Sequence, residues 1–148
     1  MTQRIWIVVG LVAVLTGPAV AKDKAADDLS GWMGMWKGMN LGSPQHVSIA
    51  PGIGGGLTVD AYVMYSDEKT IGTIPAGSFG GQVPAEWIRD GQVRIGSAGG
   101  EIIPADEAGE NDCVVDMVLV SDQVLIVTDN GRCAGYNMSF TETYGRVD

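Results

Sequence analysis

The sequence predicts an all-β fold, a small antiparallel up-and-down β-barrel with one disulfide. Short runs rich in β-branched and aromatic residues alternate with Gly, Pro, Asn and Asp turn signals along most of the chain. The chain contains 22 glycines, and segments with strong helical periodicity are scarce. Closing many short strands into a barrel removes the exposed sheet edges that would otherwise promote aggregation.

The first 21 residues have the pattern of an export signal. Arg4 provides a positive start, an apolar run follows over residues 5–15, and residues 19–21 read Ala-Val-Ala. This pattern predicts cleavage after Ala21, and the apolar run is shorter than the roughly 20 residues that a membrane span needs. We therefore expect a signal peptide over residues 1–21, and a periplasmic or secreted bacterial protein without a membrane span in its mature form.

The predicted mature chain, residues 22–148, is long enough for one domain with its own core. Removing Arg4 leaves eight basic and 18 acidic residues, a formal net charge of −10. Such a charge argues against nucleic acid or an anionic membrane as partner and favours a basic protein or a cation. An alternative interpretation is that the acidity only aids solubility.

The two cysteines, Cys113 and Cys133, predict a disulfide, because paired cysteines in an exported chain are usually oxidised. A metal site would need further ligands nearby, and His46 is the one histidine of the sequence. A reactive thiol would need a basic neighbour, for which Arg132 is the one indication.

The predicted strands follow in order after a polar lead-in over residues 22–30. The segment from Leu57 to Tyr65 has the clearest alternation, with Val59, Ala61 and Val63 on one face. Pro75 separates two shorter strands, and residues 84–90 predict one helical turn because Pro84 suits its first position. The predicted strands cover residues 32–39, 46–50, 57–65, 70–74, 78–83, 92–96, 101–103, 113–120, 123–129 and 137–144.

The last third predicts a hairpin with its turn at Ser121 and Asp122. Cys113 then lies opposite Asn130, so the disulfide fastens the open end of the hairpin to the next turn. One face of the predicted last strand, residues 137–144, carries an aromatic-rich set of side chains that includes Glu142. Glu142 is there either a buried acid or a residue at the rim of the barrel. The set is Met138, Phe140, Glu142 and Tyr144.

The ending DNGRCAGYNMSFTETY, residues 129–144, resembles the ending of small exported bacterial β-barrel proteins of uncharacterised function. Their pattern, DNGxCxGxNxSFxxxY, closes a small barrel. The segment GMWKG, residues 34–38, is similar to the G-x-W strand that begins lipocalin-type barrels. The resemblance implies a barrel of lipocalin-like or calycin-like shape and gives no activity. Glu142 departs from it, because these endings usually carry Gly there.

A cluster of soft ligands near the start of the domain indicates a possible copper site. Thioethers and imidazole suit Cu(I), and a neighbouring tryptophan can cover a bound cation. The candidate ligands are Met33, Met35, Met39 and His46, beside Trp32 and Trp36. In an alternating strand Met33 and Met35 would share a face. The alternative is structural, with Trp and Met side chains filling one end of the barrel.

Four carboxylates form a second candidate site, in a loop whose members are Asp106, Glu107, Glu110 and Asp112. Their spacing does not match a known calcium-binding loop. An alternative is that they contact a basic partner. Exported acidic barrels that inhibit basic lysozymes are the model for this, and the analogy rests on protein class and charge. A solvated loop without a partner is the remaining interpretation.

The sequence lacks the Gly-x-Ser-x-Gly, His-Glu-x-x-His and phosphate-loop motifs, and no nucleophile is tied to His46. We therefore expect a non-enzymatic binding protein, with no catalytic residues and no cofactor. Its leading interpretation is a partner or inhibitor of a basic envelope protein such as lysozyme. The alternatives are a periplasmic Cu(I)-binding protein and a carrier of a small apolar ligand.

Overall fold

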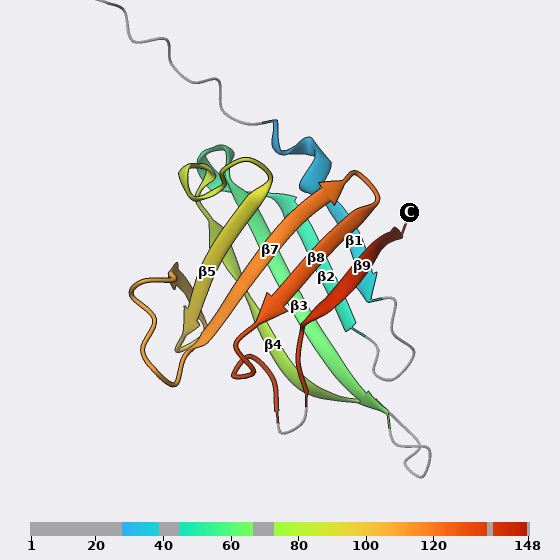
Figure 1. Ribbon diagram of the computed structural model, residues 1–148, viewed down its shortest axis with the longest axis vertical. Helices are drawn as coiled ribbons and strands as arrows, with labels where there is room; N and C mark the ends of the chain where they lie inside the picture. Colours follow the sequence, from blue (N-terminus) through green and yellow to red (C-terminus); the bar gives the residue numbers. More distant parts are fainter. Residues whose placement is uncertain (1–27, 39–44, 67–72, 136–137, 148) are drawn as a thin grey trace, which may run out of the picture.

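The computed structural model describes residues 28–38, 45–66, 73–135 and 138–147 (Figure 1). In this part of the chain nine antiparallel strands form one strongly curved sheet that nearly closes into a barrel, and the helical elements are short 3₁₀ turns. The predicted all-β barrel is thus confirmed. The predicted signal peptide and Met39 lie outside the described residues.

A 3₁₀ turn, η1 (Leu29–Trp32), precedes the first strand, and two further turns, η2 (Ile53–Gly55) and η3 (Ala85–Trp87), connect later strands. η3 follows Pro84 and confirms the predicted helical turn. The strands are β1 (Gly34–Gly38), β2 (Gln45–Pro51), β3 (Leu57–Ser66), β4 (Thr73–Val83), β5 (Gln92–Ala98), β6 (Glu101–Pro104), β7 (Cys113–Ser121), β8 (Val124–Asp129) and β9 (Glu142–Val147).

The strand order is β4-β3-β2-β1-β9-β8-β7-β5-β6, so the sheet departs from a strict up-and-down arrangement at one place. β7 pairs with β5, and β6 occupies the other side of β5. β6 therefore faces β4 across the seam of the barrel. A Cβ added to Gly81 would lie 2.9 Å from Cγ1 of Ile102, so glycine allows the two edge strands to approach closely.

Alternating apolar residues fill the barrel, as the buried positions Cys113, Val115 and Met117 of β7 illustrate. At the end covered by η1, Trp32 and Trp36 are fully buried, and Nε1 of Trp36 donates to the Trp32 carbonyl at 3.0 Å. These two side chains fill one end of the barrel, as the structural interpretation of the Trp and Met cluster expected.

The loop between β8 and β9 packs against the far side of the barrel at the opposite end. Phe140 is fully buried, and its ring meets Phe79 of β4 edge-on, with centroids 4.9 Å apart. Gly77 of β4 approaches Ala134 so closely that an added Cβ would lie 2.5 Å from the Ala134 Cα. The disulfide between Cys113 and Cys133, predicted from the sequence, fixes this loop to the start of β7.

The β7–β8 hairpin differs from its predicted register by one residue. Val115 lies opposite Asp129, whereas a turn at Ser121 and Asp122 would place it opposite Thr128. The turn residues are Asp122 and Gln123, because the Ser121 hydroxyl accepts a hydrogen bond from the Gln123 N–H at 3.2 Å. Val120 is left over as a bulge and is 58% exposed.

Three other predicted boundaries were wrong. The first strand begins at Gly34 instead of residue 32, because Trp32 belongs to η1. The strands expected on either side of Pro75 form the single strand β4, because a bulge opposite Val63 and Met64 accommodates the proline; residues 70–72 lie outside the described part. The last strand begins at Glu142 instead of residue 137. The Asp129 carboxylate accepts hydrogen bonds from the Ser139 hydroxyl and the Phe140 N–H, which fixes these residues in the loop.

We expect the double variant Cys113→Ala/Cys133→Ala to lose about 3 kcal/mol of unfolding free energy, because the disulfide closes a loop of some 20 residues. Urea unfolding followed by tryptophan fluorescence measures this loss. Reduced wild-type protein should behave as the double variant does. Equal unfolding midpoints for oxidised wild type and the double variant would contradict a stabilising role.

We expect Tyr144→Phe to destabilise the protein by about 1–2 kcal/mol, because the buried Tyr144 hydroxyl contacts Oε1 of Gln45 at 2.7 Å and the Phe140 carbonyl at 3.0 Å. Burial, then the charges of Glu142 and Asp129, raise the pKa of Tyr144. The fold therefore favours the neutral phenol. This contribution is complete below the unfolded-state pKa of about 10 and is lost as the pH rises above it.

Alkaline unfolding curves of wild type and Tyr144→Phe test this pH dependence. The variant should lose less stability than wild type between about pH 10 and 12. Tyr62→Phe is the control, because Tyr62 is 39% exposed on the outer face. Parallel curves for wild type and Tyr144→Phe would show that the phenol does not contribute.

Candidate protein-binding site

The acidic loop, residues 105–112, folds back over the outer face of β5. Ala108 lies on Gly96, where an added Cβ would be 3.0 Å from the Ala108 Cβ. The first turn of the loop is closed by the Glu107 N–H donating to the Pro104 carbonyl at 3.0 Å. Asp106, Glu107 and Glu110 are exposed to solvent. The three carboxylates therefore belong to a loop that is held against β5 by the close contact of Ala108 with Gly96.

Side chains of the loop that carries Cys133 fix the other end of the acidic loop. Nδ2 of Asn130 donates to the Asp112 carbonyl at 2.9 Å, and Nη1 of Arg132 donates to Oδ1 of Asn111 at 3.3 Å. The Asp112 carboxylate accepts the Gly109 N–H at 2.8 Å. Asp112 thus has a structural role within the loop, which distinguishes it from the three exposed carboxylates with which the sequence grouped it.

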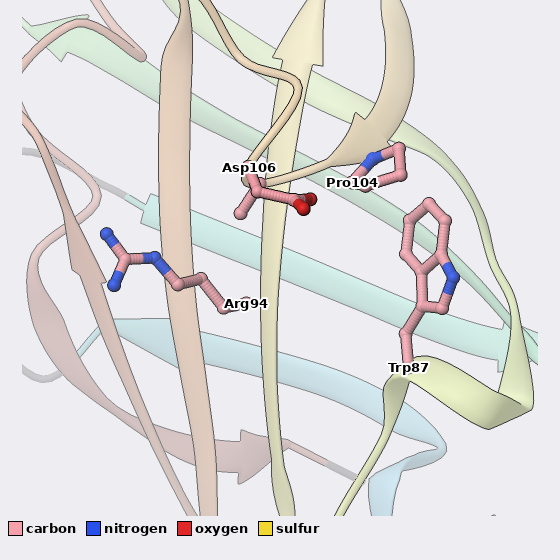
Figure 2. Close-up of a pocket in the computed structure, with 5 residues that line it drawn as sticks. Trp87, Arg94, Pro104 and Asp106 are labelled. Atoms are coloured by element: carbon pink, nitrogen blue, oxygen red, sulfur yellow. The ribbon is translucent and has the colours of Figure 1, made fainter.

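An open pocket of about 550 Å³ lies between the acidic loop and η3 (Figure 2). Trp87 and Pro104 form one wall, and Asp106 comes from the acidic loop. Figure 2 shows the Asp106 carboxylate pointing toward the side where Pro104 and Trp87 lie, whereas the Arg94 guanidinium points away from Trp87. The pocket thus combines an aromatic wall with a carboxylate.

A second pocket, of about 470 Å³, also borders Trp87. Arg89 and Arg94 line it together with Asp116. Nε of Arg94 lies 3.6 Å from Oδ1 of Asp116, and both side chains are about half exposed or more. The second pocket thus contains two arginines and two carboxylates, Asp90 and Asp116, and it shares Trp87 and Arg94 with the first pocket.

Sequence reasoning missed Trp87 and Arg94 as site residues. The sequence pattern places Trp87 in the helical turn after Pro84 and Arg94 in a strand, and it predicts a binding role for neither. One signal was available in Trp87. A large apolar side chain in a short turn between strands, next to Glu86 and Arg89, is a candidate for a surface contact.

The structure brings together only part of the proposed copper ligand set. Met35, 46% exposed, and His46 lie on the outer face of neighbouring strands. Met33 precedes β1 and packs against the core, so it does not share the strand face of Met35 as the alternation predicted. Met39 lies outside the described residues.

The His46 ring stacks on Tyr62, with centroids 5.0 Å apart, and its Nδ1 is buried without a hydrogen-bond partner. Desolvation, followed by the charge of Lys37, lowers the pKa of His46. Both effects favour the neutral imidazole over its charged form. Among the described residues, no group of three His, Cys, Asp or Glu side chains is placed to bind a metal ion, and this search does not include methionine.

Glu142 begins β9 and is half-buried beside Gly38, where an added Cβ would lie 3.2 Å from its Cγ. It therefore lies at the rim of the barrel. Inside the barrel, Trp36, Tyr144 and Met117 are fully buried. The two pockets around Trp87 lie outside, over β5, and the apolar-carrier hypothesis stays a prediction.

No family model matches the chain, no curated protein matches it, and no solved structure matches it. In the described part of the chain, none of the helices has the length and apolar character that crossing a membrane requires. The site is therefore interpreted from its own geometry and charge.

We expect Asp112→Ala to loosen the acidic loop and Glu110→Ala to leave it unchanged. The first substitution leaves the Gly109 N–H without its acceptor, a loss of about 1 kcal/mol, whereas the exposed Glu110 carboxylate has no described partner. Amide hydrogen exchange at Gly109 and its neighbours measures the difference. Equal protection in the two variants would contradict the structural role of Asp112.

Proposed function

We propose that this chain is an exported, non-enzymatic binding protein that docks a basic protein of the cell envelope, such as a lysozyme, through the acidic loop. The observation that carries the proposal is a loop with three exposed carboxylates, Asp106, Glu107 and Glu110, of which Asp106 lines the Trp87 pocket. A partly buried aromatic side chain with polar residues at its edge is a common arrangement of protein-binding surfaces.

The charge of the whole chain supports a basic partner. The formal net charge is −9 for the full sequence, with 18 acidic residues against nine basic ones. A field of this sign accelerates the encounter with a cationic protein and repels acidic ones. The acidic loop concentrates this charge beside a pocket that can bury apolar surface.

The local packing also supports docking. Ala108 on Gly96 and the hydrogen bonds from Asn130 and Arg132 restrain the loop before any partner arrives. A restrained loop loses less conformational entropy when it binds, so more of the interaction energy contributes to affinity.

The proposal includes export, a periplasmic or secreted location and the absence of enzymatic activity. Cu(I) binding through Met35 and His46 stays an alternative prediction.

Binding and inhibition assays with a basic lysozyme test the proposal. The mature chain should bind the enzyme at low salt and reduce its hydrolysis of cell walls, and the affinity should fall as salt rises. The triple variant Asp106→Asn/Glu107→Gln/Glu110→Gln should associate at least about tenfold more slowly, because the local field is weakened.

The matched control is Asp60→Asn/Glu101→Gln/Asp122→Asn, which removes three exposed carboxylates elsewhere on the barrel. Its association rate should change by less than about threefold, since only the net charge is altered. The absence of binding to basic lysozymes, or equal effects of the two triple variants, would refute docking through the acidic loop.

A further inference from the structure

We propose that the pocket between Trp87 and Asp106 takes an extended cationic side chain, an arginine of the partner, with its guanidinium lying against the Trp87 indole and paired with the Asp106 carboxylate. The inference rests on the proposed function, because it assigns the part of the basic partner that the acidic loop receives. It adds a specific ligand chemistry and a specific pocket to an electrostatic docking surface.

The aromatic wall is the first element of the pocket. Among the three tryptophans of the described residues, Trp32 and Trp36 are fully buried, and Trp87 keeps part of its surface in solvent. Trp87 also packs against the core on its inner side, which fixes its position. A fixed and accessible indole face is the preferred surface for a guanidinium group.

The charge of the pocket is the second element. Among the described residues no cation lies within salt-bridge distance of Asp106, whereas Arg94 pairs with Asp116 at 3.6 Å. In Figure 2 the Asp106 carboxylate points toward the side of Pro104 and Trp87, and the Arg94 guanidinium points away from them. Arg94 also lines the pocket, but its guanidinium points away from the aromatic wall, so the charge that faces Trp87 and Pro104 is that of the Asp106 carboxylate (Figure 2). A cation is therefore favoured over an anion.

The shape of the pocket is the third element. A volume of about 550 Å³ with an open mouth lies within the range of about 300–1,000 Å³ typical of ligand sites. Pro104 continues the apolar wall beside Trp87, so the methylene stem of an arginine can pack there while its head reaches Asp106. The next residue of the acidic loop, Glu107, is exposed to solvent as well.

Trp87 fluorescence tests the inference with a tetra-arginine peptide as probe and a tetra-citrulline peptide as its uncharged isostere. The arginine peptide should change the emission saturably, and the citrulline peptide should not. Asp106→Asn should weaken binding of the arginine peptide at least about fivefold, because it removes the paired charge from an exposed side chain without disturbing the core. Trp87→Phe should also weaken it, as measured by calorimetry.

Arg94→Gln is the decisive control, because it also removes a charge from the pocket lining. Loss of Arg94 should leave binding of the arginine peptide unchanged or strengthen it. Weaker binding in Arg94→Gln, no saturable emission change, or equal binding of the citrulline peptide would each overturn the inference.

The two proposals fail separately. If lysozyme binds through the acidic loop while the arginine peptide leaves Trp87 emission unchanged, the cation pocket is refuted and docking stands. If the arginine peptide binds as expected while basic lysozymes do not, lysozyme docking is refuted and the pocket remains a site for cationic side chains.

Discussion

The antiparallel pairing of β1 with β9 is the constraint on which the rest of the barrel depends. It joins the first and last strands and places Arg146 directly opposite Trp36. The guanidinium carbon lies 4.7 Å from the centroid of the Trp36 ring, and Nη2 of Arg146 donates to the Gly31 carbonyl. These contacts fix η1 over one end of the barrel, although Nε of Arg146 is buried without a partner. A cation–π contact and a charge-assisted hydrogen bond offset that loss.

The other end of the barrel couples stability to the candidate site. Asp129 organises the loop that buries Phe140, the next residue Asn130 binds the acidic loop, and the disulfide of Cys133 joins both to β7. The same short segment therefore closes the barrel and restrains the proposed binding surface. Preorganisation of this kind favours affinity because little freedom remains to be lost on binding. It also means that changes in this loop affect the fold and the site together.

Charge and geometry have different roles in the proposed recognition. The net charge acts over the Debye length of about 10 Å, so it steers many basic proteins toward the surface without choosing among them. Selection requires contact, and in the proposed complex the contact involves Trp87, which lines both pockets over β5. An acidic protein without such a wall would bind cations weakly and diffusely, since exposed charge pairs contribute at most about 1 kcal/mol each.

The sequence by itself determined the all-β class, the order of most strands and the pairing of Cys113 with Cys133, because period-two burial and redox context are local signals. It also grouped Asp106, Glu107, Glu110 and Asp112 as candidate partner-binding residues, since charge is visible in the sequence. Only the tertiary structure decided the bulge at Val120, the loop conformation of Phe140 and the facing of Trp87 with Asp106. Each of these depends on contacts between segments distant in sequence, such as Phe140 with Phe79 or Ala108 with Gly96. Such contacts arise when a sheet curls into a barrel, and no pattern along one strand records them.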